Sequence, residues 1–301
     1  LVRFQVFVFL ATVHVSAVDV DATHSDFVCW NSSTAGNPLP SDFIHCLLNY
    51  DGQLWIGTET AGIVRLTAKS LLLQNYVHQA GNPMSLPSNP VNAMYVSPDG
   101  TLWVGNVEGG LSRLMVNDER LTGGFVHWTT TNSALSHNSV SVLQPDAHGR
   151  LWIGTWGGGI NSIALQGNAQ PQRLVLPADL QRQTEYVGAL AYDKYNDALW
   201  IGANEGIFLY DLKTGRIEDP FPNNRNIRGC IGACIDHHGH LWMGCLMGVC
   251  DIDLKAGRAD KGKFLYRHLI HKLDKPQSPV IDKITCIYET KDGTLWLGSD
   301  G

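Results

Sequence analysis

The sequence predicts an all-β fold, a β-propeller built of four-stranded antiparallel blades, and three repeated features support this prediction. A Leu-Trp-hydrophobic-Gly unit recurs along the chain, a tight turn precedes each copy, and a glycine-rich turn follows most copies. The repeat tryptophans are Trp55, Trp103, Trp152, Trp200, Trp242 and Trp296. They are spaced by 48, 49, 48, 42 and 54 residues, and a period in this range is typical of propellers and solenoids.

Each repeat contains four runs with the character of short strands. An apolar run such as residues 43–50 ends at a two-residue turn, here Asp51-Gly52, and Asp-Gly is a strong hairpin signal because both turn positions favour positive φ. The second run carries the tryptophan, and a glycine-rich turn such as residues 157–159 leads into the third run. An outer run completes the unit, as at residues 263–268. Four strands in about 45 residues form one propeller blade, and the missing 3.6-residue period argues against a helical solenoid.

The chain begins with the composition of an export signal. Arg3 precedes an apolar run at residues 4–13, and small residues follow, which predicts a secretory signal peptide over residues 1–17. An uncleaved membrane anchor is the alternative, although the apolar run is shorter than the about 20 residues that span a bilayer. We expect residues 18–42 to form a leader that contains an outer strand of a blade, and residues 43–301 to form the blades.

The sixth repeat is incomplete. Residue 301 follows the tryptophan strand of the sixth repeat, so the outer two strands of that repeat are not in the sequence. We therefore expect about five and a half blades, arranged in an open arc or an imperfectly closed ring. Propellers are closed rings of about four to eight blades, so we expect this chain to come from a longer protein. The expected parent has a seven-bladed propeller.

Composition excludes several classes of partner. Hydrophobic residues make up 44% of the chain, which is enough for a substantial core, and the net charge is −6 with no basic cluster. Nucleic acid and anionic membrane surfaces are therefore not expected as partners. The seven cysteines are an odd number for an exported protein, and we expect at most one disulfide, whose pairing the sequence does not give. Four of them occupy the runs that precede hairpins and are expected to behave as small hydrophobic residues: Cys46, Cys230, Cys234 and Cys286.

The repeat resembles a known family. Residues 51–66, Asp-Gly-Gln-Leu-Trp-Ile-Gly-Thr-Glu-Thr-Ala-Gly-Ile-Val-Arg-Leu, are similar to the two-component regulator propeller repeat, and residues 148–163 are a closer match. The resemblance extends over nearly all of residues 27–301. The fourth copy departs from the pattern at its hairpin, Asn196-Asp197, and the fifth at Cys245.

This repeat builds the periplasmic sensor region of bacterial hybrid two-component histidine kinases. The resemblance thus implies a non-enzymatic periplasmic sensor that is anchored in the inner membrane in its full-length form. It also implies further blades and a signalling module in the same polypeptide, and we expect a dimer of the full-length protein. Two alternatives remain open at this point, an exported propeller enzyme acting on polysaccharide as a lyase or hydrolase, and a protein-interaction scaffold.

The sequence predicts no catalytic or metal-binding motif. Histidines and cysteines cluster around residues 234–245, and Cys-x-x-His spacing suits zinc, but the histidines occupy a hairpin turn where any solvated polar residue suffices. The glycine-rich segment 154–159 lacks the Lys-Ser/Thr of a phosphate-binding loop. We expect no catalytic residue, no metal and no cofactor in this chain.

Recognition is expected at one face of the disc. In a four-stranded blade, the turn between the second and third strands opens on the same face as the link to the next blade, and divergent loops on a repeated scaffold usually carry binding residues. The candidate ligand-binding residues on this face are Glu59, Glu108, Trp156, Asn204, Glu205 and Arg225. Trp156 lies outside the repeated Leu-Trp pair, and its ring suits the apolar face of a sugar. We therefore predict a small-molecule or oligosaccharide ligand, although Trp156 could instead pack on a neighbouring loop.

Overall fold

A computed structural model describes residues 31–33, 39–67, 73–115, 124–222, 224, 226–259, 263–270 and 283–299. The predicted signal peptide and the predicted outer strand near residues 27–30 lie outside these residues. The regular secondary structure of the described residues is β-strand apart from one short helix, α1 (Ala178–Gln183). The predicted fold class, an all-β propeller of four-stranded antiparallel blades, is confirmed.

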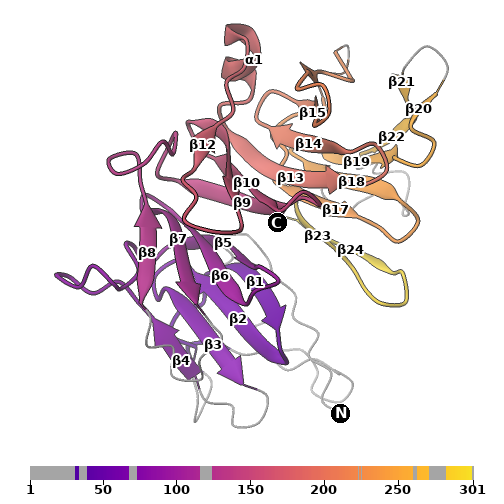
Figure 1. The fold of residues 1–301 in the computed structure, drawn as a ribbon. Helices are drawn as coiled ribbons and strands as arrows, with labels where there is room; N and C mark the ends of the chain where they lie inside the picture. The colour runs from indigo at the N-terminus through magenta and orange to yellow at the C-terminus, as the bar shows by residue number, and fades with distance from the viewer. Residues whose placement is uncertain are drawn as a thin grey trace, which may run out of the picture.

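The described strands form five four-stranded antiparallel sheets and then a two-stranded sheet, named here blades I to VI in chain order (Figure 1). Blade I comprises β1 (Ile44–Tyr50), β2 (Gln53–Thr58), β3 (Ile63–Thr67) and β4 (Leu73–Tyr76). Blade II comprises β5 (Val91–Val96), β6 (Thr101–Asn106), β7 (Gly110–Met115) and β8 (Phe125–Trp128). Blade III comprises β9 (Val140–Pro145), β10 (Arg150–Thr155), β11 (Gly159–Ala164) and β12 (Gln172–Arg173).

The second half of the chain continues the pattern. Blade IV comprises β13 (Val187–Asp193), β14 (Ala198–Ala203), β15 (Ile207–Asp211) and β16 (Ile217–Glu218). Blade V comprises β17 (Gly232–Ile235), β18 (His240–Cys245), β19 (Gly248–Asp253) and β22 (Tyr266–Leu269). Blade VI comprises β23 (Ile284–Glu289) and β24 (Leu295–Ser299). A small hairpin, β20 (Arg258–Ala259) and β21 (Lys263–Phe264), interrupts blade V, so the outer run predicted at residues 263–268 is divided between this hairpin and β22.

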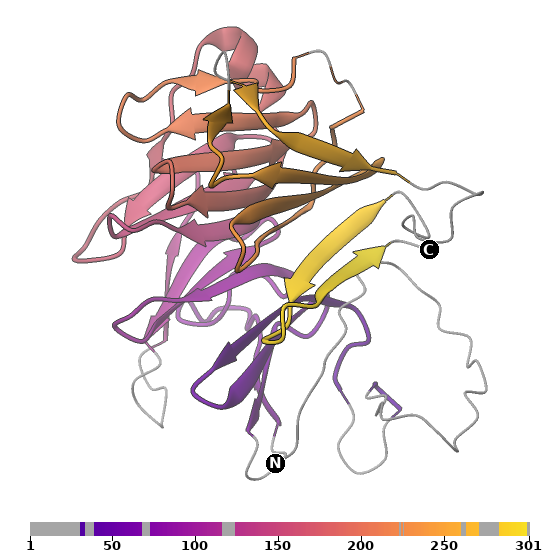
Figure 2. The same ribbon diagram turned by 90° about the vertical axis from the view of Figure 1, so that its right-hand side faces the viewer.

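The first strands of successive blades are neighbours. β1, β5, β9, β13, β17 and β23 contact one another in that order, which places them at the inside of the arc of blades seen in Figure 2. Each blade is a simple meander from this inner strand outward. The long inner hairpins predicted from the turn residues are observed, for example Tyr50 paired with Gln53 around Asp51-Gly52.

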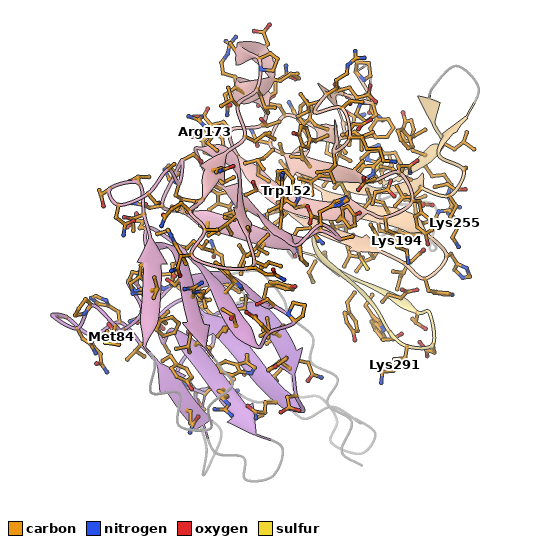
Figure 3. The ribbon with its side chains drawn as sticks, viewed as in Figure 1. Met84, Trp152, Arg173, Lys194, Lys255 and Lys291 are labelled. Atoms are coloured by element: carbon orange, nitrogen blue, oxygen red, sulfur yellow. The ribbon has the colours of Figure 1, made fainter. Side chains whose placement is uncertain are left out.

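Four of the six repeat tryptophans are buried between blades, as predicted. Trp103 of blade II shares a hydrophobic cluster with Val140 and Ile153 of blade III. Trp152 of blade III, labelled in Figure 3, packs in the same way with residues of blade IV. Trp55, Trp103, Trp152 and Trp200 are each exposed by 1% or less, whereas Trp296 of blade VI is 41% exposed. Blades I to IV thus each contribute an indole to the core that they share with the next blade.

The glycine that follows each tryptophan allows this close approach. A Cβ atom on Gly105 would lie 2.6 Å from Cγ1 of Val140, and one on Gly154 would lie 2.8 Å from Cγ1 of Val187. Both valines begin the inner strand of the following blade. The repeated Trp-hydrophobic-Gly pattern is therefore a packing requirement between blades.

A side chain at the end of the inner strand connects the indole to the hairpin turn. In blade III, Asp146 accepts a hydrogen bond from Trp152 Nε1 on Oδ2 (2.9 Å), while its Oδ1 accepts the backbone N–H groups of His148 (2.8 Å) and Arg150 (3.0 Å). The corresponding indole acceptors in other blades are Ser97 Oγ (3.3 Å), Asp193 Oδ2 (3.2 Å) and Asp236 Oδ2 (2.8 Å). In blade I this position is Asn49, which is exposed, and Trp55 Nε1 has no hydrogen-bond partner among the described residues.

We expect Asp146→Ala to lower the free energy of unfolding by about 1–3 kcal/mol, because it leaves a buried indole N–H without its acceptor and removes the cap of the turn. Asn49→Ala is the matched control at the same position of blade I, where no indole is bound, and it should change stability by less than about 0.5 kcal/mol. Urea unfolding followed by tryptophan fluorescence measures both. Equal effects of the two substitutions would contradict this role for Asp146.

Candidate functional site

The turns between second and third strands gather at one end of the blades together with the residues that precede the inner strands. Trp156 donates its backbone N–H to the carbonyl of Ser139 (2.9 Å), and Asn204 donates to Tyr186 (3.0 Å). The equivalent bonds in blades I and II are Glu59 to Phe43 and Val107 to Pro90, each 3.0 Å. This end of the blades is called the turn face below, and the opposite end, which carries the hairpins between first and second strands, is called the hairpin face.

Trp156 is exposed on a fixed backbone. Its side chain is 44% exposed, and an isolated antiparallel β-bridge joins it to Tyr186, which precedes the inner strand of blade IV and is 52% exposed. The amides of Gly157 and Gly159 both donate to the carbonyl of Glu185 at 3.0 Å. Two aromatic side chains from adjacent blades are thus presented to solvent by a hydrogen-bonded turn.

Backbone hydrogen bonds connect this part of the turn face to blade V. Gly229 donates its N–H to the carbonyl of Asn204 (2.9 Å), and Leu246 donates to the carbonyl of Arg228 (3.2 Å). Leu246 and Met247 are 41% and 42% exposed. The term apolar ledge is used below for Trp156, Tyr186, Leu246 and Met247.

Three predicted site residues lie along this ledge, and Glu59 and Glu108 belong to the turns of other blades. Trp156, Asn204 and Glu205 occupy the turns of blades III and IV, where Asn204 Nδ2 donates to Glu205 Oε1 (3.0 Å). Glu59 belongs to the turn of blade I, and its Oε2 lies 2.8 Å from His45 Nε2. Glu108, with φ of 61°, is in the turn of blade II, and Arg225 lies outside the described residues.

Sequence reasoning missed Tyr186 as a site residue. It lies at the end of a polar link, directly before an inner strand, where no repeated pattern marks it. The same place in blade I is Phe43, which is 43% exposed. An aromatic residue immediately before an inner strand is the sequence signal that could have found both.

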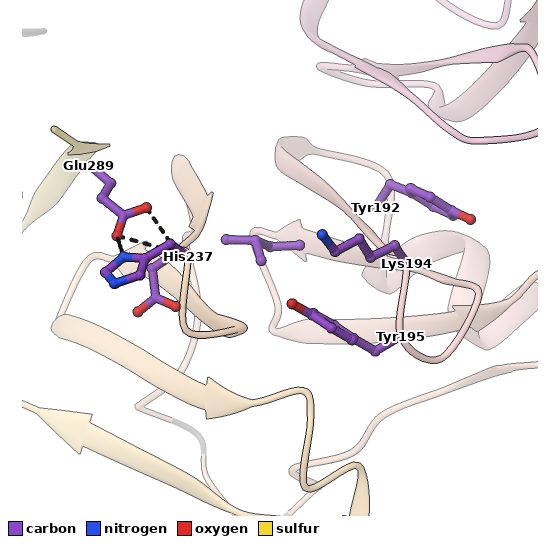
Figure 4. Close-up of a pocket in the computed structure, with 7 residues that line it drawn as sticks. Tyr192, Lys194, Tyr195, His237 and Glu289 are labelled. Carbon is purple, nitrogen blue, oxygen red and sulfur yellow. Dashed lines mark hydrogen bonds and ion pairs between the residues drawn. The ribbon is translucent and has the colours of Figure 1, made fainter. Parts of the chain in front are cut away.

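A pocket opens on the hairpin face. It has a volume of about 370 Å³ and lies between the hairpins of blades IV and V and the end of β23 (Figure 4). Its lining consists of Tyr192, Lys194, Tyr195, Ile235, Asp236, His237 and Glu289. Within the residues that the structure describes, no three His, Cys, Asp or Glu side chains are grouped so as to hold a metal ion.

Side-chain pairs connect neighbouring blades on the hairpin face. His148 Nε2 of blade III lies 2.7 Å from Asp197 Oδ1 of blade IV, and Tyr192 donates its hydroxyl to the same oxygen (3.0 Å). The hydrogen bond between His148 and Asp197 raises the pKa of His148 and lowers that of Asp197. The pKa of Tyr192 is raised to about 12, mainly by burial and also by the hydrogen bond that its hydroxyl makes to Asp197. The His237 backbone N–H of blade V donates to Glu289 Oε2 of blade VI (2.9 Å), and the His237 ring also contacts this carboxylate.

Comparison with known proteins identifies the repeats. Four segments match the family model for the two component regulator propeller, residues 38–60, 85–108, 134–157 and 280–301. These four segments carry the two-component regulator propeller repeat. The matched segments fall on blades I, II, III and VI, so the fourth and fifth copies, whose sequences depart from the repeat, are the two without a match. No curated protein sequence matches this chain.

Solved structures share the fold of this regulator propeller. The extracellular domains of two proposed hybrid two-component systems from B. thetaiotaomicron are similar to it, one with 22% identity and a TM-score of 0.68, the other with 19% and 0.72. The alignments cover 85% and 90% of this chain and 31% and 34% of those chains. The chain thus spans about a third of the length of these domains.

Virginiamycin B lyase from Staphylococcus aureus is also similar in fold, with 15% identity, a TM-score of 0.59 and coverage of 85% of this chain and 78% of the lyase. In the described part of the chain, no helix has the length and apolarity needed to cross a bilayer.

The His148–Asp197 pair makes stability depend on pH. A raised histidine pKa contributes stability that is fully present below the unfolded-state pKa, near 6.5, and is lost as pH rises through the folded-state value. Asp197 has a lowered pKa, so its contribution is lost only on acidification below its unfolded-state value near 3.8. We expect the difference in urea midpoint between the parent and His148→Asn to be larger at about pH 5.5 than at about pH 8.5.

His238→Asn is the matched control for this measurement. His238 occupies the same turn position of blade V and has no ion pair among the described side chains. Its substitution should leave the pH dependence of the parent unchanged. A His148→Asn variant that keeps the full pH dependence of the parent would refute the assignment.

Proposed function

We propose that this chain is the non-enzymatic ligand-recognition part of an exported two-component signalling protein. The regulator propeller repeats support the sensor role, and the similar fold of two extracellular sensor domains supports export to the periplasm. In the full-length protein, further blades and a signalling module follow in the same polypeptide, the protein is anchored in the inner membrane, and it acts as a dimer.

The observation that carries this proposal is the exposure of Trp156 beside Tyr186. Large aromatic side chains are normally buried, and a contiguous exposed apolar patch commonly marks a binding surface. Backbone hydrogen bonds hold both residues in place before any ligand arrives, so little conformational entropy is lost when a ligand binds. The apolar ledge is therefore a preorganised surface for a ligand with a flat apolar face.

A sugar ring is the ligand chemistry that fits these groups best. Its C–H face can stack on the indole of Trp156, while its hydroxyls can bond to the amide of Asn204 and the carboxylate of Glu205 at the next turn. The proposed ligand class is therefore a small oligosaccharide that lies across blades III to V. Glu59, Glu108 and Arg225 remain candidates for contacts with a longer ligand.

We expect Trp156→Ala to weaken oligosaccharide binding about tenfold or more, because it removes a stacking contact worth on the order of 1 kcal/mol beyond the buried area. Nearly half of this residue is exposed, so the unfolding midpoint should stay close to that of the parent. A glycan array identifies a binding oligosaccharide, and isothermal titration calorimetry with that oligosaccharide compares the variants.

Two controls make the measurement specific. Tyr195→Ala removes an aromatic ring that is 40% exposed on the hairpin face, and it should not change the affinity. Trp103→Ala removes a buried ring and should cost about 3–5 kcal/mol of stability before any effect on binding can be read. If Trp156→Ala binds as tightly as the parent, the ledge is not the site. If polysaccharide is cleaved during the titration, an enzymatic function replaces the sensor role.

A further inference from the structure

Two cysteines of blade V lie against each other in the core. Cys230, in the link that precedes β17, has its sulfur 2.9 Å from the sulfur of Cys245, the last residue of β18. Cys230 is 2% exposed and Cys245 is fully buried. A movement of less than about 1 Å would bring the two sulfurs to the 2.05 Å of a disulfide bond.

The position of this pair follows from the register of the blade. In blades I to IV, the first residue of the inner strand pairs across a bulge with the last residue of the second strand: Ile44 with Thr58, Val91 with Asn106, Val140 with Thr155, and Val187 with Ala203. The bond from Ile231 N to Gly244 O (3.0 Å) continues the same ladder in blade V. Cys230 and Cys245 therefore occupy directly opposed cross-strand positions, which bring Cβ atoms within about 5 Å.

We propose that Cys230 and Cys245 form a disulfide bond in the exported protein, and that this bond fixes the blade V part of the apolar ledge. Disulfides persist in oxidising compartments such as the periplasm. A third buried cysteine, Cys250 on β19, lies nearby and remains a thiol in this scheme.

The reaction is an ordinary thiol–disulfide exchange with a disulfide-bearing oxidant, either a protein thiol oxidase or glutathione disulfide. The thiolate of one cysteine attacks the oxidant and forms a mixed disulfide, and one oxidant thiolate leaves. The thiolate of the other cysteine then attacks the protein sulfur of the mixed disulfide and releases the second oxidant thiolate. Two electrons pass from the cysteine pair to the oxidant, and the two cysteine protons end on the released thiols or in solvent.

The order of events is set by burial. The hydrogen bond with Cys245 and the loss of solvent raise the pKa of Cys230, so the folded blade contains little reactive thiolate. The oxidant cannot reach either sulfur once blade V is packed. The bond should therefore form while the blade is folding.

The bond would act directly on the candidate site. Leu246, a ledge residue, follows Cys245 in the sequence, and its side chain packs over Gly229, which precedes Cys230: a Cβ on that glycine would lie 2.4 Å from Leu246 Cγ. A covalent link between the two cysteines would hold the segment of Gly229 and the segment of Leu246 together through the core. The Leu246–Met247 turn would be more mobile in the reduced protein.

Peptide mapping of the refolded chain tests the proposal without relying on export. The chain is unfolded with reductant, refolded in a glutathione redox buffer, alkylated under denaturing conditions and digested for mass spectrometry. The expected result is one peptide pair that joins Cys230 to Cys245. The oxidised form should melt several degrees above the reduced form, and protein that is folded before the oxidant is added should form the bond far more slowly.

Substitutions complete the test. Cys250→Ser should keep both the linked peptides and the difference in melting temperature, whereas Cys230→Ser and Cys245→Ser should each abolish them. If a serine variant fails to fold, the peptide map of the unaltered chain still decides. Full alkylation of both cysteines after refolding, or a link from either of them to Cys250, would overturn the proposal. The same map made on periplasmic and cytoplasmic preparations of the chain tests export separately.

Discussion

The packing of one indole from each repeat against the next blade is the interaction on which the rest of the structure depends. A buried indole contributes a large apolar area but also an N–H that must be paired. The Asp or Ser at the end of the inner strand supplies the acceptor, and in blade III the same carboxylate caps the hairpin turn. The glycine after the tryptophan lets the next inner strand approach. Each core therefore belongs to two blades, and stability accumulates between neighbours, as in other repeat proteins.

This scaffold leaves the two faces of the arc with different roles. On the hairpin face, side chains from one blade bind the next, as His148 binds Asp197 and Asn196 Nδ2 donates to the carbonyl of Leu254 (3.1 Å). On the turn face, backbone hydrogen bonds connect the turn of blade III to the residues that precede blade IV, and Trp156 and Tyr186 remain exposed. Side chains that are not needed for packing can diverge, and this is the physical basis for placing recognition on the turn face.

Blade V departs from the other blades in three related ways. An inserted hairpin, β20 and β21, displaces its outer strand, and its Trp242 is only partly buried against the two-stranded blade VI. In addition, the cross-strand pair that joins an aliphatic residue to Thr, Asn or Ala in blades I to IV is a pair of cysteines in blade V, Cys230 and Cys245.

The sequence by itself determined the features that depend on neighbouring residues. The spacing of the tryptophans predicted the blades, and the Asp-Gly and His-Gly pairs predicted the inner hairpins. The positions of the turns distinguished the two faces and made Trp156 a candidate binding residue. Only the tertiary structure decided which distant residues meet: Tyr186 beside Trp156, Asp197 beside His148, and Cys230 opposite Cys245. These contacts depend on the bulged register within a blade and on the stacking of one blade against the next. Both are set by packing across chain segments that local propensity does not relate, so no pattern in the sequence marks them.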